Sequence, residues 1–229
     1  MTFIRNAWYA AAESPEVVDE LLGRTICGDP VVLFRNDVGT PAALEDRCCH
    51  RHLPLSLGNR VGSMVQCGYH GLRFDASGNC VSVPGQSRVP PGASVRAYPV
   101  VERYRYIWIW PGDPGKADPD LIPDYHWNED PKWVSNTGYF HVEGNHQLLV
   151  DNLLDLSHVQ FVHATTLGAD GVTDAPLNTR RYANHVHINR WIMDKPPPGM
   201  FAGAGNFSAN VDRWQLITWT APTHVVIDA

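Results

Sequence analysis

Apolar residues occur in short runs broken by turn-forming residues through the first half of the chain, between Thr25 and Pro111. The run at 105–110, RYIWIW, alternates well enough to predict a half-buried strand. The stretches 36–39 and 75–78 lie between such runs and begin and end with the residues that hairpin turns favour. The first half is therefore predicted to be mostly β-structure.

A linker-like stretch dense in Pro, Asp and Gly follows at 111–133, PGDPGKADPDLIPDYHWNEDPKW. Such composition is typical of a domain boundary. We place the boundary near Asn128, which predicts one domain at 1–128 and a second at 129–229.

Residues 144–167, GNHQLLVDNLLDLSHVQFVHATTL, have the strongest helical pattern in the chain. Apolar residues lie on several of its faces, which predicts a buried helix. The tail, 173–229, returns to strand-like sequence that is broken by the turn-rich segment 195–206, KPPPGMFAGAGN.

Composition supports a folded protein and excludes some partners. The chain has 229 residues, 44% hydrophobic and 18% charged, with a net charge of -6, which argues against nucleic acid or an anionic membrane surface. Neither a secretory signal nor an apolar stretch of transmembrane length is apparent, so a cytoplasmic, reducing compartment is expected. Five cysteines in such a chain indicate metal ligands or free thiols rather than disulfides.

Two short segments, Cys48-x-His50 and Cys67-x-x-His70, each contain one cysteine and one histidine. In a Rieske [2Fe-2S] cluster, two thiolates hold one iron and two imidazoles hold the other, so two such loops fit its ligand set. A structural zinc site would more usually show paired cysteines and paired histidines, and zinc remains the alternative. The other cysteines, Cys27, Cys49 and Cys80, are expected to be buried or half-buried residues without a ligand role.

A second polar group, Asp155, His158 and His163, lies within the predicted helix. A regular helix would separate the two histidines by about 140°, so a shared metal requires a π-bulge or a break between them. Taken alone, two histidines on an apolar helix are better explained as hydrogen-bonded core residues.

The segments RCCHRHLPLS and CGYHGLRFD resemble the C-x-H-R and C-x-x-H-G-x-x-F motifs of the Rieske family. Leu53 and Tyr69 lie where respiratory members have an extra cysteine, so the resemblance is to the Rieske non-heme iron aromatic-ring oxygenases. Within them, the chain is most similar to the oxygenase components of vanillate O-demethylase, toluenesulfonate methyl-monooxygenase and dicamba O-demethylase.

The motif D-x-x-H-x-x-x-x-H resembles the mononuclear iron site of that family. The resemblance implies that His158 and His163 bind Fe(II) together with a carboxylate. It implies further that Asp155 is the acid linking the iron site to a cluster histidine of a neighbouring subunit, and that Asn152 lies beside the iron.

The family implies an α+β fold: an N-terminal Rieske antiparallel β-sandwich, then an incomplete helix-and-antiparallel-sheet, helix-grip-like catalytic domain, assembled as a homotrimer. Electrons would come from NADH through a flavin and ferredoxin-type reductase. Fe(II) and O2 would then hydroxylate a methoxy or methyl carbon of a small aromatic substrate. A Rieske electron carrier is the alternative function, but it would end near the linker.

The family's third iron ligand, an Asp, is expected beyond Ala229, since none of four downstream aspartates has the family context, and the sequence is therefore expected to be a fragment or an incomplete gene product. These aspartates are Asp174, Asp194, Asp212 and Asp228. Four arginines are expected at the surface, with pairing to a substrate carboxylate or sulfonate as the alternative. They are Arg180, Arg181, Arg190 and Arg213.

Overall fold

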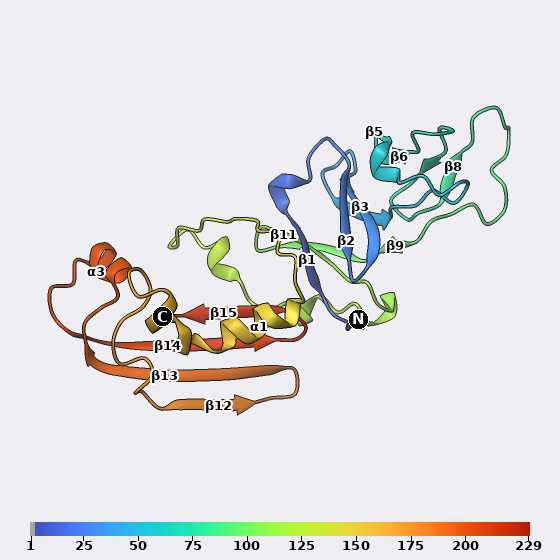
Figure 1. Cartoon of the computed structure of the whole chain (residues 1–229). Coiled ribbons are helices and arrows are strands. Elements are labelled where there is room, and N and C mark those ends of the chain that lie inside the picture. Colours follow the sequence, from blue (N-terminus) through green and yellow to red (C-terminus); the bar gives the residue numbers. More distant parts are fainter. Residues whose placement is uncertain (1–2) are drawn as a thin grey trace. The chain divides into compact units, whose positions relative to one another are not determined.

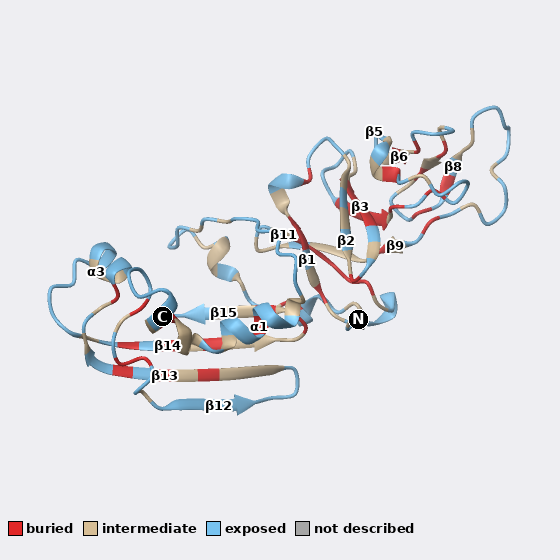
Figure 2. Ribbon diagram, viewed as in Figure 1, coloured by how far each residue is buried: buried red, intermediate tan, exposed pale blue. Residues whose placement is uncertain are grey.

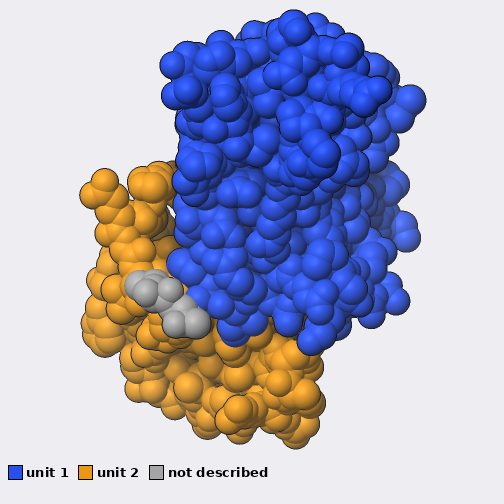
Figure 3. Space-filling model, turned by 90° about the vertical axis from the view of Figure 1, so that its right-hand side faces the viewer, with its two compact units in different colours: residues 1–137 blue, residues 138–229 orange. Residues whose placement is uncertain are grey.

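The computed structural model describes residues 3–229 and divides into two compact units, 1–137 and 138–229 (Figures 1 and 3). Both units are built on antiparallel sheets with few and short helices, so the predicted α+β class is confirmed. The compact unit ends shortly after the boundary expected near Asn128, and the 128/129 domain division itself stays a prediction.

The first unit contains three antiparallel sheets, with strand orders β1-β11-β10, β2-β3-β4-β9 and β5-β6-β7-β8. The strands are β1 (Tyr9–Glu13), β2 (Leu22–Ile26), β3 (Asp29–Arg35), β4 (Pro41–Glu45), β5 (Asn59–Val61), β6 (Met64–Gln66), β7 (Arg73–Phe74), β8 (Cys80–Ser82), β9 (Ala97–Tyr98), β10 (Val100–Arg103) and β11 (Tyr106–Ile109). The 3-10 helices are η1 (Ser14–Glu16), η2 (Leu55–Leu57), η3 (Pro114–Lys116), η4 (Pro119–Leu121) and η5 (His126–Asn128).

Strand β11 is central to its sheet and is buried on both faces (Figure 2). Ile107 and Ile109 belong to one hydrophobic cluster, while Trp108 and the following Trp110 belong to another. Because side chains alternate between the faces of a strand, each face of β11 supplies one cluster. The prediction of a half-buried strand was wrong, since both faces of this strand are covered.

The two predicted hairpin turns are confirmed. The N–H of Gly39 donates to the carbonyl of Asn36 at 3.0 Å, between β3 and β4. The N–H of Gly78 donates to the carbonyl of Asp75 at 3.0 Å, between β7 and β8. Each of these hydrogen bonds closes a tight turn.

Residues that follow the predicted boundary belong to the first unit because they satisfy polar groups of the β10–β11 turn. The N–H of Arg105 donates to Glu129 at 3.2 Å, and its guanidinium donates to Ser135 Oγ at 2.8 Å. Asn128 donates to the carbonyl of Tyr104 at 3.3 Å. Tyr104 and Arg105 have left-handed backbone conformations, with φ of 58° and 66°, so these contacts fasten a turn that lacks glycine.

The second unit pairs one four-stranded antiparallel sheet, in the order β12-β13-β14-β15, with short helices (Figure 1). The helices are α1 (His146–Leu154), η6 (Leu156–His158), α2 (Val159–Val162) and α3 (Gly199–Gly205). The strands are β12 (Leu177–Arg181), β13 (His185–Lys195), β14 (Val211–Thr220) and β15 (His224–Asp228). The turn-rich segment 195–206 thus contains a helix, α3, which its Gly and Pro content did not predict.

The single buried helix expected at 144–167 is wrong in both respects. The segment forms α1, η6 and α2, and the chain leaves the helical conformation at Asp155, with φ -112° and ψ 91°. Within α1 and α2 only Val150 and Val159 are buried. Their apolar neighbours are exposed, namely Leu148, Leu149, Leu153, Phe161 and Val162 (Figure 2). Apolar patterning identifies a helix's apolar face but does not establish that the described chain covers it.

Two sheets of the first unit are joined by an ion pair between Arg35 of β3 and Glu102 of β10. The guanidinium donates to both carboxylate oxygens, at 2.8 and 2.6 Å, and its Nε donates to the carbonyl of Val17 at 2.6 Å. The hydrogen bonds from Arg35 lower the pKa of the Glu102 carboxyl below its ordinary value of 4.5. The pair therefore favours the folded state while Glu102 is ionised.

Replacing Glu102 with Gln is expected to lower the free energy of unfolding at neutral pH. Since the folded pKa is depressed, this contribution is present above pH 4.5 and is lost as the pH falls through the folded pKa. Urea unfolding across that range should show the variant and the wild type converging in acid. The exposed Glu20→Gln should change little throughout, and a Glu102→Gln deficit independent of pH would contradict the assignment.

Candidate functional site

The two predicted cluster loops share one backbone arrangement. The N–H of Cys48 donates to the carbonyl of Leu53 at 2.9 Å, and the N–H of His52 donates back to Cys48 at 2.9 Å. In the second loop, the N–H of Cys67 donates to Leu72 at 2.8 Å, and the N–H of Gly71 donates back to Cys67 at 3.1 Å. Each cysteine therefore closes its own loop with the same pair of hydrogen bonds.

The equivalence extends to the residue four positions after each cysteine. His52 and Gly71 both have left-handed backbones, with φ of 59° and 71°. Non-glycine residues rarely adopt this conformation, so the loop closure fixes an unfavourable torsion at His52. His52 is exposed and does not lie in a ligand position of its loop.

The four predicted ligands come together as two inner thiols and two outer imidazoles. Cys48 and Cys67 are each 2% exposed, and burial together with the neighbouring Cys67 thiol raises the pKa of Cys48 to about 11. The His50 and His70 rings are exposed, with centroids 4.6 Å apart. Iron binds cysteine as the thiolate, so cluster binding would displace the protons of both thiols.

The first loop is anchored at its base by Asp46, which is buried. Its carboxylate accepts from the N–H of Ser56 at 2.6 Å and from Ser56 Oγ at 2.5 Å. Beside the ligands, Cys49 is exposed, which corrects the expectation of burial, whereas Cys27 and Cys80 are buried as expected.

The donor set fits a Rieske cluster better than a single metal ion. Among residues 3–229, no group of three or more His, Cys, Asp or Glu side chains is placed to hold one metal. A Rieske cluster does not need such a group, because each iron takes two protein ligands and its sulfides supply the rest. Two thiols and two imidazoles on paired loops meet that requirement.

In the second unit, Asp155 caps the turn that carries His158. Its carboxylate accepts from the N–H of Ser157 at 2.9 Å, and this hydrogen bond lowers the pKa of the Asp155 carboxyl. Its backbone carbonyl lies 2.7 Å from Nδ1 of His158. A carbonyl only accepts, so Nδ1 carries the proton and Nε2 keeps the lone pair that a metal requires.

The rings of His158 and His163 are 5.5 Å apart between centroids. No regular helix joins them: His158 ends a 3-10 turn, and His163 lies just after α2 with φ -112° and ψ 29°. His163 and Asn152 are exposed, and Asn152 lies on α1. The structure thus brings the two histidines together, and their roles and that of Asn152 stay predictions.

Arg190 and Arg213 are buried, at 4% and 9% exposure, so their expected surface location was wrong. Arg180 and Arg181 are exposed, as expected. Arg190 donates from Nη2 to Ser157 Oγ at 3.1 Å, beside His158. Along β13 and β14, each arginine lies in a series of alternate positions that also contains buried isoleucines. This period-two pattern is the sequence signal that could have placed both arginines on the buried face.

The chain belongs to the Rieske non-heme iron oxygenase family. Residues 7–99 match the Rieske [2Fe-2S] domain, and residues 142–229 match the vanillate O-demethylase oxygenase C-terminal domain. The second match argues against a Rieske electron carrier, because an electron carrier needs only the Rieske domain. The family uses a Rieske cluster and mononuclear Fe(II), and one related crystal structure, of dicamba monooxygenase, is described with non-heme iron.

Among its relatives, the chain is 44% identical to the iron-sulfur subunit of a toluene-4-sulfonate monooxygenase system from Comamonas testosteroni, over 99% of this chain and 66% of that protein. It is 40% identical to a vanillate O-demethylase oxygenase subunit from Pseudomonas sp., over 99% and 65%. A crystal structure of dicamba monooxygenase bound to 3,6-dichlorosalicylic acid superposes with a TM-score of 0.95 and 41% identity, over 99% of this chain and 67% of that one.

The chain spans just under two thirds of the length of those two curated relatives. In the part that the structure describes, no helix is long and apolar enough to cross a membrane.

Replacing Gly71 with Ala is expected to reduce the iron-sulfur content of the purified protein. A Cβ at Gly71 would lie 3.0 Å from Pro84 Cγ on a backbone with φ of +71°, so the substitution strains the second loop and crowds Pro84. Visible absorbance and acid-labile sulfide measure the loss. Gly85→Ala is the matched control, because Gly85 also has a positive φ, +76°, but nothing within 4 Å. Equal losses in both variants would show that loop closure at Gly71 does not matter.

Proposed function

We propose that this chain supplies the Rieske part and the start of the catalytic part of a terminal oxygenase for a small substituted aromatic. The observation that carries the proposal is the presence of two separate ligand sets, one in each unit. The Cys48/His50/Cys67/His70 set suits a [2Fe-2S] cluster, and the His158/His163 pair suits Fe(II). An electron carrier would need only the first.

The residues of the first unit would hold the cluster. The buried thiols of Cys48 and Cys67 would bind one iron, and the exposed imidazoles of His50 and His70 would bind the other. Electron exchange with a partner is proposed to take place at the exposed imidazoles. A separate NADH-dependent reductase of flavin and ferredoxin type is the proposed donor.

The residues of the second unit orient the iron ligands. The Asp155 carbonyl holds His158 with Nε2 free, and the Asp155 carboxylate, which is exposed, carries the negative charge proposed to link the two metal centres. Asn152 is proposed to lie beside the iron. The carboxylate that completes a facial triad is proposed to come from sequence beyond Ala229, since the described residues offer no third donor.

The cluster supplies electrons singly and Fe(II) supplies the activation of O2, as in 2-His-1-carboxylate oxygenases. For a methoxyarene, one O2, two electrons and two protons give a hydroxymethyl ether and one water. The bond between the hydroxymethyl carbon and the ether oxygen on the ring then breaks, and the hydroxyl proton passes to that oxygen. The products are a phenol and formaldehyde. A homotrimer is the proposed assembly, so that Asp155 can face the cluster of a neighbouring subunit.

Replacing His50 with Cys is expected to lower the reduction potential of the cluster, on the order of 100 mV or more. An anionic thiolate stabilises the oxidised cluster better than a neutral imidazole does. Redox titration of the anaerobically purified chain, followed in the visible, measures the shift. His52→Ala, which changes an exposed histidine of the same loop, should leave the potential unchanged. A colourless protein that holds one zinc would end the proposal.

Asp155→Asn tests the oxygenase proposal directly. The protein for this test is the present chain joined after Ala229 to the C-terminal third of the toluene-4-sulfonate monooxygenase subunit, and it is called the extended protein below. Asn still accepts from the N–H of Ser157, so the turn is preserved and only the charge is lost. We expect iron and sulfide contents to be retained and most turnover of a methoxybenzoate to formaldehyde to be lost.

Two controls complete that experiment. His158→Ala should abolish turnover and remove mononuclear iron while leaving the cluster spectrum intact. Arg181→Gln removes an exposed charge and should leave turnover unchanged. The contradicting outcome is an extended protein whose cluster is reduced by NADH and the reductase, but whose product formation is unaffected by substitution of Asp155 or His158.

A further inference from the structure

The turn η6, which carries His158, is held against the sheet by two side chains of strand β13. Arg190 and Ile192 are 4% and 1% exposed and lie on one face of the sheet, because alternate residues of a strand point the same way. Ile192 packs with Val159 in one hydrophobic cluster. Arg190 donates from Nη2 to Ser157 Oγ at 3.1 Å. The turn is therefore fixed to β13 by an apolar contact just after it and by a charge-assisted hydrogen bond within it.

A continuous polar chain runs from Arg190 through Ser157 to Asp155. A guanidinium can only donate, so the Ser157 hydroxyl accepts from Arg190 and keeps its own proton for another acceptor. The N–H of Ser157 donates to the Asp155 carboxylate at 2.9 Å, and this hydrogen bond, followed by one from the Ser157 hydroxyl, lowers the pKa of that carboxyl. Asp155 is exposed, so these contacts restrict its side chain where packing does not.

Asp155 also orients His158, through its main chain. Its carbonyl lies 2.7 Å from Nδ1 of the imidazole, and its backbone is extended, with φ -112° and ψ 91°, at the point where α1 ends and η6 begins. A residue between two helices is held by its capping contacts. At Asp155 these contacts lead to Ser157 and, through it, to the buried guanidinium of Arg190.

We propose that Arg190 acts through Ser157 as a positioning residue for His158. Its hydrogen bond holds η6 and the cap, Asp155, in the conformation that keeps the imidazole proton on Nδ1 and leaves Nε2 free for a metal. An arginine that only stabilised the sheet would have no effect on that tautomer. The functional meaning rests on the proposed role of His158 as an iron ligand, whereas the link between Arg190 and the tautomer can be measured in this chain without iron.

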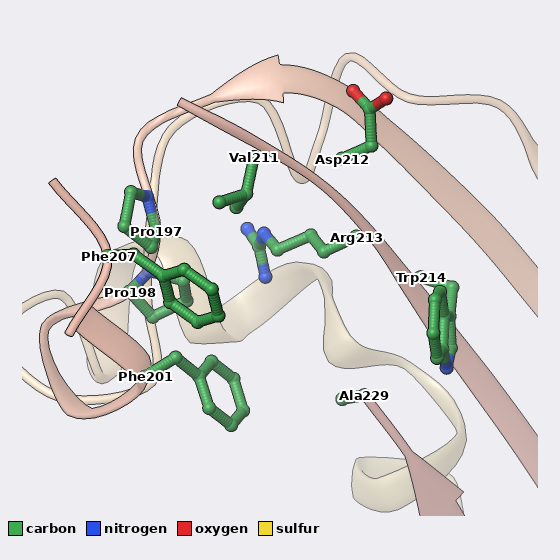
Figure 4. A pocket seen from close by; sticks show the side chains of 9 residues that line it. All are labelled: Pro197, Pro198, Phe201, Phe207, Val211, Asp212, Arg213, Trp214 and Ala229. Carbon is green, nitrogen blue, oxygen red and sulfur yellow. The ribbon is translucent and has the colours of Figure 1, made fainter. Parts of the chain in front are cut away.

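Arg213 provides a matched comparison on the same face of the sheet. It is buried, at 9% exposure, and lies opposite Ile192 in the register, so the two side chains share a face. Its guanidinium lies among proline and phenylalanine side chains of the segment before β14 (Figure 4), namely Pro197, Pro198, Phe201 and Phe207. None of these residues belongs to the polar chain. Arg213→Met therefore removes a buried guanidinium and leaves the contacts of Ser157 in place.

The tautomer of His158 in the 229-residue chain is the direct readout. Long-range proton–nitrogen correlation spectra of isotope-labelled protein distinguish the two ring tautomers at a pH of about 8.5, where an ordinary imidazole is neutral. His158 of the wild type should be mainly protonated on Nδ1. Arg190→Met should raise the fraction protonated on Nε2 at least about threefold, because the hydrogen bond that fixes the turn is lost. Ser157→Ala should do the same.

The two substitutions should not add, because they break the same polar chain: Arg190→Met in a Ser157→Ala background should cause no further shift. Ser157→Thr keeps the hydroxyl, and it should keep the wild-type tautomer, as should Arg213→Met. An unchanged tautomer in Arg190→Met would overturn the proposal, and so would additive shifts or an equal shift in Arg213→Met. Ser157→Ala removes only one hydroxyl, so an unchanged tautomer in that variant overturns it even if Arg190→Met does not fold.

Metal binding by the extended protein separates this inference from the proposed function. Equilibrium dialysis against Co(II) should show at least about tenfold weaker binding at the mononuclear site in Arg190→Met, with the visible spectrum of the cluster unchanged. Wild-type Co(II) affinity in that variant would overturn the positioning role and leave the oxygenase proposal standing. A tautomer that depends on Arg190, in an extended protein that binds no Co(II) through His158, would confirm the polar chain and overturn the iron site.

Discussion

The candidate cluster site depends on one backbone constraint, the closure of each ligand loop onto its own cysteine. The N–H of Cys48 and that of Cys67 each point back into their loops, which holds both thiols inward, at 2% exposure, and leaves His50 and His70 at the surface. A cluster of two irons with unlike ligands needs two thiolates for one iron and two imidazoles for the other, and this arrangement keeps the two ligand types apart. The closure also requires one residue with a left-handed backbone in each loop. Gly71 adopts this conformation without strain, whereas His52 adopts it at a cost.

The two units differ in how their polar and apolar groups are balanced. The first has three hydrophobic clusters, with β11 contributing to two of them from its opposite faces. The second has a single small cluster around Val172, two buried arginines and exposed leucines on α1. Since buried apolar area supplies most of the folding free energy, the second unit has less of it to offset its buried charges. Local opening is therefore expected to be easier there than in the Rieske unit.

Sequence predicted which residues come together in the candidate cluster site because that geometry is local: each short loop holds one cysteine and one histidine. Their role as ligands stays a prediction. His158 and His163 were paired only through the family motif, since nothing in helical periodicity shows that the chain leaves the helix at Asp155 and caps a new turn. Burial was the least predictable property. RYIWIW has the alternation of a half-buried strand, although both faces of that strand are covered. The arginines at 190 and 213 were assigned to the surface by residue type alone. Their burial depends on strand partners that are distant in sequence.

His158 is oriented by a carbonyl of the main chain, not by a side chain. No substitution can delete that acceptor, so the tautomer and aim of the imidazole do not depend on which residue follows Leu154. The carboxylate at that same position projects separately and caps the next turn through Ser157. The orientation of the imidazole and the local charge thus depend on different atoms of one residue. A substitution at this position can change the charge beside His158 and still leave the main-chain acceptor of its Nδ1 in place.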